Sequence, residues 1–548
     1  MDSPEQARGS RLYPVAKSPA MMIVMTPLLW TRQVFLTVLF LGLFAMASHN
    51  VTDPDVWWHL KTGQYIAEHK SVPHTDLFSF TGAGQPWVTH EWLTELLLYE
   101  IQRVAGWGGL IVLFSAAVAA AFLFLYLRCG PAPYVAGIAA LIGALACMPV
   151  WGVRPQVLSL LLTSLWLLIL ERSERNSTLL WWTLPLMLLW VNLHAGFAVG
   201  VAFSALFLAG EWVEHALGSP SQQSGSRLRP AALILVLNLL IVLLNPNGLR
   251  MFSYPIETLR SAAMQNYIAE WASPNFHRAE YWPLLVVVLA TFAVLGWSRR
   301  PPRPRDLLLL GVSLYAALCS IRMTPLFVLI AVPLVATRLG DWPTRNSVTR
   351  RPHAAVRIVL NGAITVAMAA FAGIHIAQVV ERQPQAEAEH FPVSAAAFLA
   401  THSVPGPIFN HYDWGGYLIW RLYPSTRVFI DGRADLYQKQ LLDKFADTYQ
   451  LKGDWRRTLQ SWAIKTVLVP NDSALATVLR KSPGWTVIYE DAQSVVLIAA
   501  APPYLGGVAP SILNRANPGP QGGCRTGRTA ITVGMQENTP HRASCRLL

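Results

Sequence analysis

The chain has 548 residues, of which 53% are hydrophobic and only 14% are charged. Soluble domains carry roughly 25% charged residues, so this composition excludes an ordinary soluble protein and predicts a polytopic α-helical membrane protein. The formal net charge of +12 does not indicate a nucleic-acid partner, because the arginines gather in alternate short loops between apolar segments.

Apolar segments recur between residues 34 and 380. Each spans, or nearly spans, the roughly 20 residues that a helix needs to cross a bilayer, so we predict a transmembrane domain of about 11 helices over residues 34–380. The segments are residues 34–48, 109–127, 134–150, 157–170, 179–193, 197–213, 231–245, 283–297, 307–321, 324–339 and 356–380.

The distribution of basic residues predicts the orientation of these helices. The N-terminal segment, residues 1–33, is basic, and the short loops on the same side of the membrane carry most of the remaining arginines of this region. The short loops of the other side hold little beyond Arg154 and Arg322, which is the positive-inside pattern of a cytoplasmic N-terminus. The basic residues assigned to the cytoplasmic side are Arg8, Arg11, Lys17, Arg32, Arg128, Arg172, Arg175, Arg227, Arg229, Arg299, Arg300, Arg303, Arg305, Arg345, Arg350 and Arg351.

The region after the last apolar segment has a different pattern. With an odd number of spans, residues 381–501 are expected outside the cytoplasm. Short apolar runs at 406–410, 426–431, 465–469, 485–489 and 494–498 predict strands, and 414–422 and 473–480 predict helices, so we expect an extracytoplasmic α/β domain. Residues 502–548 are rich in Gly, Pro, Arg and Ser without periodicity, which predicts a disordered tail.

The large first outer loop, residues 49–108, begins with the segment Asp53-Pro-Asp55. An Asp-x-Asp pair can hold a divalent cation such as Mg²⁺ or Mn²⁺. Alternatively, one carboxylate can accept the proton of an attacking hydroxyl while the other orients it. The structural alternative is an Asp-Pro turn with an Asx-type cap on a helix that begins at Val56.

The same loop holds further polar residues. His59 lies four residues after Asp55 and so shares its face of the predicted helix, where it could contact a phosphate or a metal ion, or simply lie at the membrane interface. His90 and Glu91 precede another helix. Glu91 could be a second acid of the site, or a charge that the helix dipole favours.

Four residues of later segments belong to the same predicted face. Arg154 and Arg322 stand at helix ends, where arginine can bind a phosphate bidentately or extend to lipid head groups. His194 and Glu270 are candidates of the same kind. One extracytoplasmic active site would gather all these clusters on one side, and ordinary interface residues and loop caps are the alternative.

Two dense polar motifs mark the predicted α/β domain. They are Asp413-Trp-Gly-Gly-Tyr417 and Phe429-Ile-Asp-Gly-Arg-Ala-Asp435. They could bind an acceptor, or they could fix the domain to the membrane part. We favour the structural role.

Several of these motifs together resemble a group of bacterial multi-pass proteins that look like members of the GT-C glycosyltransferase superfamily. The resemblance covers about residues 30 to 500 and is strongest in the first outer loop. The motifs are Asp-Pro-Asp-Val-Trp-Trp-His-Leu at 53–60, His-Glu-Trp at 90–92, Val-Arg-Pro-Gln at 153–156, Trp-Val-Asn-Leu-His at 190–194, Asn-Pro-Asn-Gly at 245–248 and Asn-His-Tyr-Asp-Trp-Gly-Gly-Tyr at 410–417.

The resemblance implies a GT-C-like fold, a polyprenyl-phosphate-linked sugar donor and transfer on the outer face of the bacterial inner membrane. It also implies an essential acid in the first outer loop, acting as general base or metal ligand, and the matching positions here are Asp53 and Asp55. No second acidic motif follows in a later outer loop, so the need for a divalent cation stays open. No other cofactor is expected.

We therefore expect an inverting, Asp-assisted transfer of a sugar to a lipid, glycan or protein acceptor of the envelope. The alternatives are a membrane transporter and a non-catalytic envelope scaffold. Helix interiors nearly free of ionisable residues speak against a coupled transporter. The expected catalytic residues are Asp53, Asp55 and Glu91, and the expected substrate-binding residues are His59, His90, Arg154, His194, Glu270 and Arg322.

Overall fold

The membrane part is a bundle of apolar helices. The computed structural model describes residues 19–217, 224–298, 301–340 and 354–500. Each predicted apolar segment overlaps a helix. Within these ranges seven helices are long and apolar enough to cross a membrane, and three shorter apolar helices and α12 join them. The bundle consists of α1 (Pro19–Ala47), α3 (Trp92–Tyr126), α4 (Pro133–Cys147), α5 (Pro155–Arg172), α6 (Thr183–Leu193), α7 (Phe197–Ala216), α8 (Ser224–Val242), α11 (Trp282–Trp297), α12 (Pro304–Cys319), α13 (Thr324–Gly340) and α14 (Ala354–His390).

The chain is therefore a polytopic α-helical membrane protein, as its composition predicts. The predicted tail and most of the predicted N-terminal segment lie outside the described residues. So do several arginines on which the predicted orientation rests, namely Arg8, Arg11, Arg299, Arg300, Arg345, Arg350 and Arg351, together with Lys17. The orientation stays a prediction.

Shorter helices connect the ends of the bundle. The longest of them, α2 (Val56–His69), buries Val56, Trp57 and Leu60 and packs against α3. Gly63 permits this packing, because a Cβ atom there would lie 2.0 Å from the carbonyl oxygen of Glu95. The other connecting helices are η1 (Met148–Val150), η2 (Ser177–Trp182), α9 (Arg250–Arg260), α10 (Ala262–Tyr267), η3 (Ala269–Trp271), η4 (Ala279–Tyr281) and η5 (Ile321–Met323).

The C-terminal region folds as an α/β domain. Its sheet has the strand order β1-β2-β4-β3, with β1 parallel to β2 and the other neighbours antiparallel. Val467, Leu468 and Val469 of β2 and Val495, Val496 and Leu497 of β4 are fully buried. The elements are α15 (Val393–Thr401), β1 (Ile408–Asn410), η6 (Tyr412–Trp414), α16 (Gly415–Leu422), α17 (Ala434–Tyr449), α18 (Trp455–Ser461), β2 (Thr466–Pro470), α19 (Ala474–Lys481), β3 (Trp485–Glu490) and β4 (Ser494–Ala499).

One predicted strand of this domain is wrong. Residues 426–431 form no strand of the sheet; instead, Val428 makes an isolated parallel bridge to Ser79 of the first outer loop. The amide of Val428 donates to the carbonyl of Phe78 at 3.2 Å, and its carbonyl accepts from Phe80 at 3.1 Å. The apolar run is buried as expected, but its partner comes from a distant segment of the chain.

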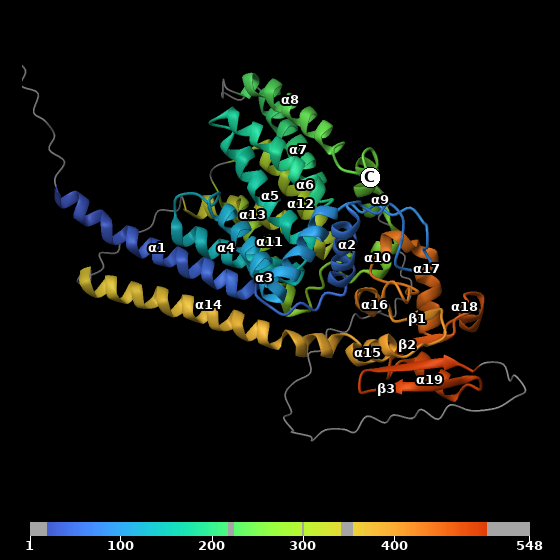
Figure 1. The fold of residues 1–548 in the computed structure, drawn as a ribbon. Coiled ribbons are helices and arrows are strands. Elements are labelled where there is room, and N and C mark those ends of the chain that lie inside the picture. Colours follow the sequence, from blue (N-terminus) through green and yellow to red (C-terminus); the bar gives the residue numbers. More distant parts are fainter. Residues whose placement is uncertain (1–18, 218–223, 299–300, 341–353, 501–548) are drawn as a thin grey trace, which may run out of the picture.

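Helix α14 joins the bundle to the C-terminal domain. It runs beside α1 and leads to the orange and red domain at one end of the bundle (Figure 1). Near its end, the Gln383 amide pairs with the backbone of Val51 through two hydrogen bonds of 2.8 and 2.9 Å. This contact holds the start of the first outer loop against α14.

A buried arginine holds the C-terminal domain on the first outer loop. The guanidinium of Arg433 lies 2.8 Å from the Asp76 carboxylate of that loop and 2.7 Å from Asp431 of its own domain. All three side chains are fully buried. The Arg433 Cζ atom also lies 4.7 Å from the centre of the Trp87 ring.

We expect Arg433→Met to destabilise the protein by roughly 3–5 kcal/mol, because it leaves two carboxylates buried without their cation. Thermal unfolding and limited proteolysis of the purified protein measure the effect, and the C-terminal domain should become protease-sensitive first. Arg427→Met, at an exposed position of the same domain, is the matched control. Equal unfolding temperatures for the two variants would contradict the assignment.

Candidate active site

A cavity of about 210 Å³ opens where α2, α9 and the C-terminal domain meet at the beginning of α3. Most of the polar residues singled out from the sequence line it, although they come from segments far apart in the chain. These lining residues are Asp55, His59, His90, Glu91, His194 and Arg322. Asp53, Arg154 and Glu270 do not line the cavity but join it through ion pairs.

The two carboxylates of the Asp-Pro-Asp segment have different environments. The Asp53 carboxylate accepts a hydrogen bond from the Asp55 amide at 2.9 Å, which forms an Asx turn, and it also pairs with Arg154. The Asp55 carboxylate makes no cap hydrogen bond to α2 and accepts from the Trp58 indole at 3.1 Å. Burial raises the pKa of Asp55 to about 7, and the nearby charge of Asp53 adds to the rise.

Arg154 is the centre of a chain of ion pairs behind the cavity. It contacts the carboxylates of both Asp53 and Glu270. Glu270 in turn lies 3.7 Å from Arg322, which lines the cavity. Burial opposes the charge of the Arg154 guanidinium, but the two carboxylates outweigh it and hold its pKa above the ordinary value.

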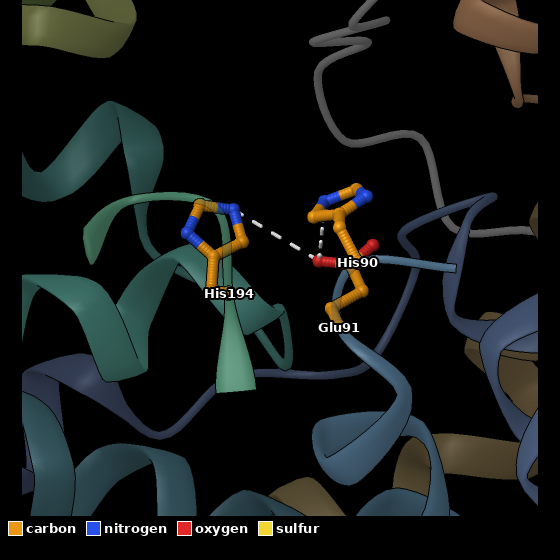
Figure 2. A group of neighbouring side chains, drawn as sticks. All are labelled: His90, Glu91 and His194. Atoms are coloured by element: carbon orange, nitrogen blue, oxygen red, sulfur yellow. Dashed lines mark ion pairs between the residues drawn. The ribbon is translucent and has the colours of Figure 1, made fainter. Parts of the chain in front are cut away.

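Glu91 is the centre of a second cluster. Its carboxylate lies 3.6 Å from His59, 3.4 Å from His90 and 3.9 Å from His194. Burial would raise the pKa of Glu91, but the positive charges of His90 and His59 lower it well below its usual range. Figure 2 shows the ion pairs of His90 and His194 with the same oxygen of this carboxylate.

The histidines of this cluster differ in charge. Burial would lower the pKa of His59, but Glu91 and Glu95 raise it, and the Nδ1 atom of His59 lies 3.4 Å from Glu95. Glu91 likewise raises the pKa of His90 against the effect of burial. Burial lowers the pKa of His194 to about 3, so its ring is neutral.

Hydrogen bonds fix the orientation of the imidazole rings of His90 and His194. His90 Nδ1 lies 3.2 Å from the carbonyl of Val88, which can only accept, so Nδ1 carries a proton and Nε2 faces Glu91. His194 Nδ1 accepts from the Gly196 amide at 3.0 Å and lies 2.8 Å from the Ser159 hydroxyl. Its Nε2 atom faces Glu91.

The C-terminal domain closes one side of the cavity. Gly432, Arg433 and Asp435 line it, and Asp435 accepts a hydrogen bond of 3.1 Å from the Tyr254 hydroxyl. The backbone at Gly432 lies so close to Asp55 that a Cβ atom would come within 1.7 Å of the carboxylate oxygen. Burial raises the pKa of Asp435. The motif that ends at Asp435 therefore both fixes the domain and supplies part of the cavity wall.

The structure thus brings all nine predicted site residues into two adjoining clusters around one cavity. Their roles stay predictions. Sequence reasoning did not single out Glu95 or Tyr254 as site residues. Glu95 had a detectable signal, since it follows Glu91 by four residues and shares its helix face. Tyr254 had none.

Known proteins resemble this chain in their three-dimensional structure and not in their sequence. No family model matches the chain, and no curated relative matches it. The chain is similar to a solved structure of the archaeal oligosaccharyltransferase AglB from Archaeoglobus fulgidus in complex with an inhibitory peptide and a dolichol-phosphate. The two share 10% identity over 79% of this chain and 69% of that one, with a TM-score of 0.50.

A second similar structure is that of ArnT from Cupriavidus metallidurans bound to undecaprenyl phosphate. The two chains share 14% identity over 89% of this chain and 100% of that one, with a TM-score of 0.46. At these identities the likeness to AglB shows the fold alone. The chain has a GT-C-like membrane fold with a C-terminal α/β domain, and the expected fold class is confirmed.

Proposed function

We propose that the protein transfers a sugar from a polyprenyl-phosphate-linked donor to an acceptor of the cell envelope, on the outer face of the membrane. The observation that carries this proposal is the cavity in which Asp55, Glu91 and Arg322 meet. A carboxylate with a raised pKa beside arginine and histidine in a partly apolar cleft is the arrangement that group transfer requires. The dolichol-phosphate in the AglB structure, which has the same fold, supports a polyprenyl phosphate as the lipid.

Arg322 is the candidate for holding the donor phosphate. Arg154 is already paired with two carboxylates, Asp53 and Glu270. The 3.7 Å contact between Arg322 and Glu270 is longer than a hydrogen bond, so it leaves N–H donors of Arg322 for a phosphate. His59, whose pKa is raised, adds positive charge on the same cavity wall.

Asp55 is the candidate general base. In the proposed step the acceptor hydroxyl attacks the anomeric carbon, its proton passes to the Asp55 carboxylate, and the bond from that carbon to the phosphate oxygen breaks. The polyprenyl phosphate leaves with the electron pair, and Arg322 stabilises its charge. Attack opposite the leaving group inverts the anomeric centre. Asp53, paired with Arg154, positions the segment.

We further propose that His90, Glu91 and His194 hold a divalent cation. One ligand atom from each lies within 4.8 Å of the others, and in the described part of the chain the Oε2 atom of Glu91 is buried without a hydrogen-bond partner. We prefer this group to Asp53 and Asp55 because Arg154 already occupies the Asp53 carboxylate. Two imidazoles and one carboxylate suit Zn²⁺ or Mn²⁺ better than Mg²⁺.

Such a cation would supply Lewis-acid stabilisation of the departing phosphate. Binding at Nε2 of His194 would require its proton on Nδ1, where it would be donated to the Ser159 hydroxyl 2.8 Å away and would replace the hydrogen bond that Nδ1 accepts from the Gly196 amide. The Nδ1 proton of His90 is already held by the Val88 carbonyl, which leaves Nε2 for a metal.

We expect Asp55→Asn to lower the rate of sugar transfer by roughly 10²–10⁴-fold, the usual contribution of a general base. The assay uses purified full-length protein in lipid, radiolabelled polyprenyl-phosphate sugars and an envelope extract as acceptor. Asp53→Asn should cost less, because it removes a positioning contact and leaves the base in place.

Asp413→Asn is a control for this pair, since Asp413 is another carboxylate near the cavity that does not line it. Wild-type turnover by Asp55→Asn would contradict the role of this carboxylate. Failure of the wild-type protein to use any donor would favour a scaffold or a transporter, and solute flux in sealed vesicles would separate those two.

The rate should depend on pH through the ionisation of Asp55. Only the carboxylate form accepts a proton, so with a pKa of about 7 the rate should rise up to that pH and level off above it. The charge of Asp53 raises this pKa, so Asp53→Asn should move the midpoint of the pH–rate profile to lower pH. A midpoint that is the same in wild type and Asp53→Asn would contradict the assignment.

Removal of the proposed cation ligand should weaken metal binding. We expect Glu91→Gln to reduce the affinity for Mn²⁺ or Zn²⁺ by at least roughly 100-fold, measured by calorimetric titration of chelator-treated protein. Glu68→Gln, at an exposed position on α2, is the matched control. Equal affinities for the two variants would disprove the site.

A further inference from the structure

A second cavity, of about 540 Å³, lies away from the candidate active site among the ends of α3, α5, α12 and α13. Five arginines and three carboxylates line it, an excess of two positive charges. The arginines are Arg128, Arg172, Arg175, Arg305 and Arg338, and the carboxylates are Glu171, Glu174 and Asp306.

Two of these arginines are neutralised by local ion pairs. Arg128 makes a bidentate contact with Glu171, with distances of 2.7 and 3.0 Å. Arg305 pairs with Glu174 and lies 3.4 Å from Asp306. These pairs account for all the carboxylates of the cavity wall and leave the remaining arginines uncompensated.

The remaining arginines are Arg172, Arg175 and Arg338, and they have no carboxylate partner in the part of the chain that the structure describes. Within that part the Nε atom of Arg338 is also buried without a hydrogen-bond partner. A buried guanidinium donor is costly to leave unpaired, and an anionic oxygen would satisfy it.

The wall of the cavity is also apolar. Leu167, Ile330 and Leu334 line it beside the arginines, and they belong to membrane-spanning helices α5 and α13. A wall with both arginines and aliphatic side chains fits a molecule with a charged head and an apolar body better than it fits a free anion. Basic pockets between transmembrane helices commonly bind lipid head groups.

The two cavities lie on opposite faces of the membrane. Arg154 of the ion-pair chain immediately precedes α5, and Arg172 is the last of its 18 residues. A helix of this length spans about 27 Å, close to the thickness of the hydrocarbon core. The second cavity is therefore on the face that the positive-inside pattern predicts to be cytoplasmic.

We propose that this cavity binds the head group of an anionic phospholipid on the membrane face opposite the candidate active site. The phosphodiester lies against Arg172, Arg175 and Arg338, and the acyl chains lie along α5 and α13. The lipid joins the ends of these helices, so its binding also stabilises the bundle. The site is independent of the proposed sugar transfer.

The test measures lipid binding by the delipidated full-length protein in detergent. Phosphatidylglycerol and phosphatidylcholine are titrated separately and bound lipid is counted by native mass spectrometry. The variant is Arg172→Gln/Arg175→Gln/Arg338→Gln. The control variant Arg427→Gln/Arg456→Gln/Arg457→Gln removes the same charge from exposed positions of the C-terminal domain.

We expect wild type and control to bind phosphatidylglycerol in preference to phosphatidylcholine and to unfold at a higher temperature with it. The cavity variant should lose affinity on the order of 100-fold, about fivefold for each arginine. The corresponding triple Arg→Lys variant should keep most of the affinity, which separates charge from a folding defect.

Three results would overturn the proposal. The cavity variant could bind phosphatidylglycerol as tightly as the control does. Phosphatidylcholine could bind as tightly as phosphatidylglycerol. Inorganic phosphate could displace the lipid at the same concentration, which would make the cavity a site for a free anion instead of a phospholipid.

Discussion

The buried contact of Arg433 with Asp76 and Asp431 is the interaction on which the relation between the two parts of the molecule depends. A guanidinium and two carboxylates out of water are tolerated only when each has an oppositely charged partner at close distance. That requirement sets the position of the C-terminal domain on the first outer loop. The same backbone then carries Gly432 against Asp55 and Asp435 into the cavity wall. The shape of the candidate site is thus a consequence of domain docking.

Burial also gives two aspartates of one short motif different properties. Asp53 faces Arg154 and stays paired, whereas Asp55 faces Gly432 and the Trp58 indole. A carboxylate that loses water without gaining a cation has a raised pKa, which suits it to accept a proton near neutral pH. The sequence shows the two residues as equivalent; their surroundings separate an orienting group from a candidate base.

The bundle places two different charge clusters at the two ends of α5. At one end, Arg154 is fully paired and supports a cavity whose carboxylates and histidines suit group transfer. At the other end, Arg172 belongs to a wall with excess positive charge. The residues of α5 between them are mostly apolar. The chemistry proposed for each end depends on whether its charged side chains have oppositely charged partners within the fold.

The sequence by itself determined the membrane class, the helical segments, the α/β character of the C-terminal region and the gathering of the polar motifs at one end of the bundle. Hydropathy and local periodicity encode these features directly. Tertiary structure decided that residues 426–431 pair with the first outer loop, that Asp53 binds Arg154, and that Glu91 lies among the histidines. It also brought Tyr254 and Asp435 together at the cavity. These contacts join residues far apart in the chain, and the packing that creates them depends on the whole bundle, so no local pattern records them.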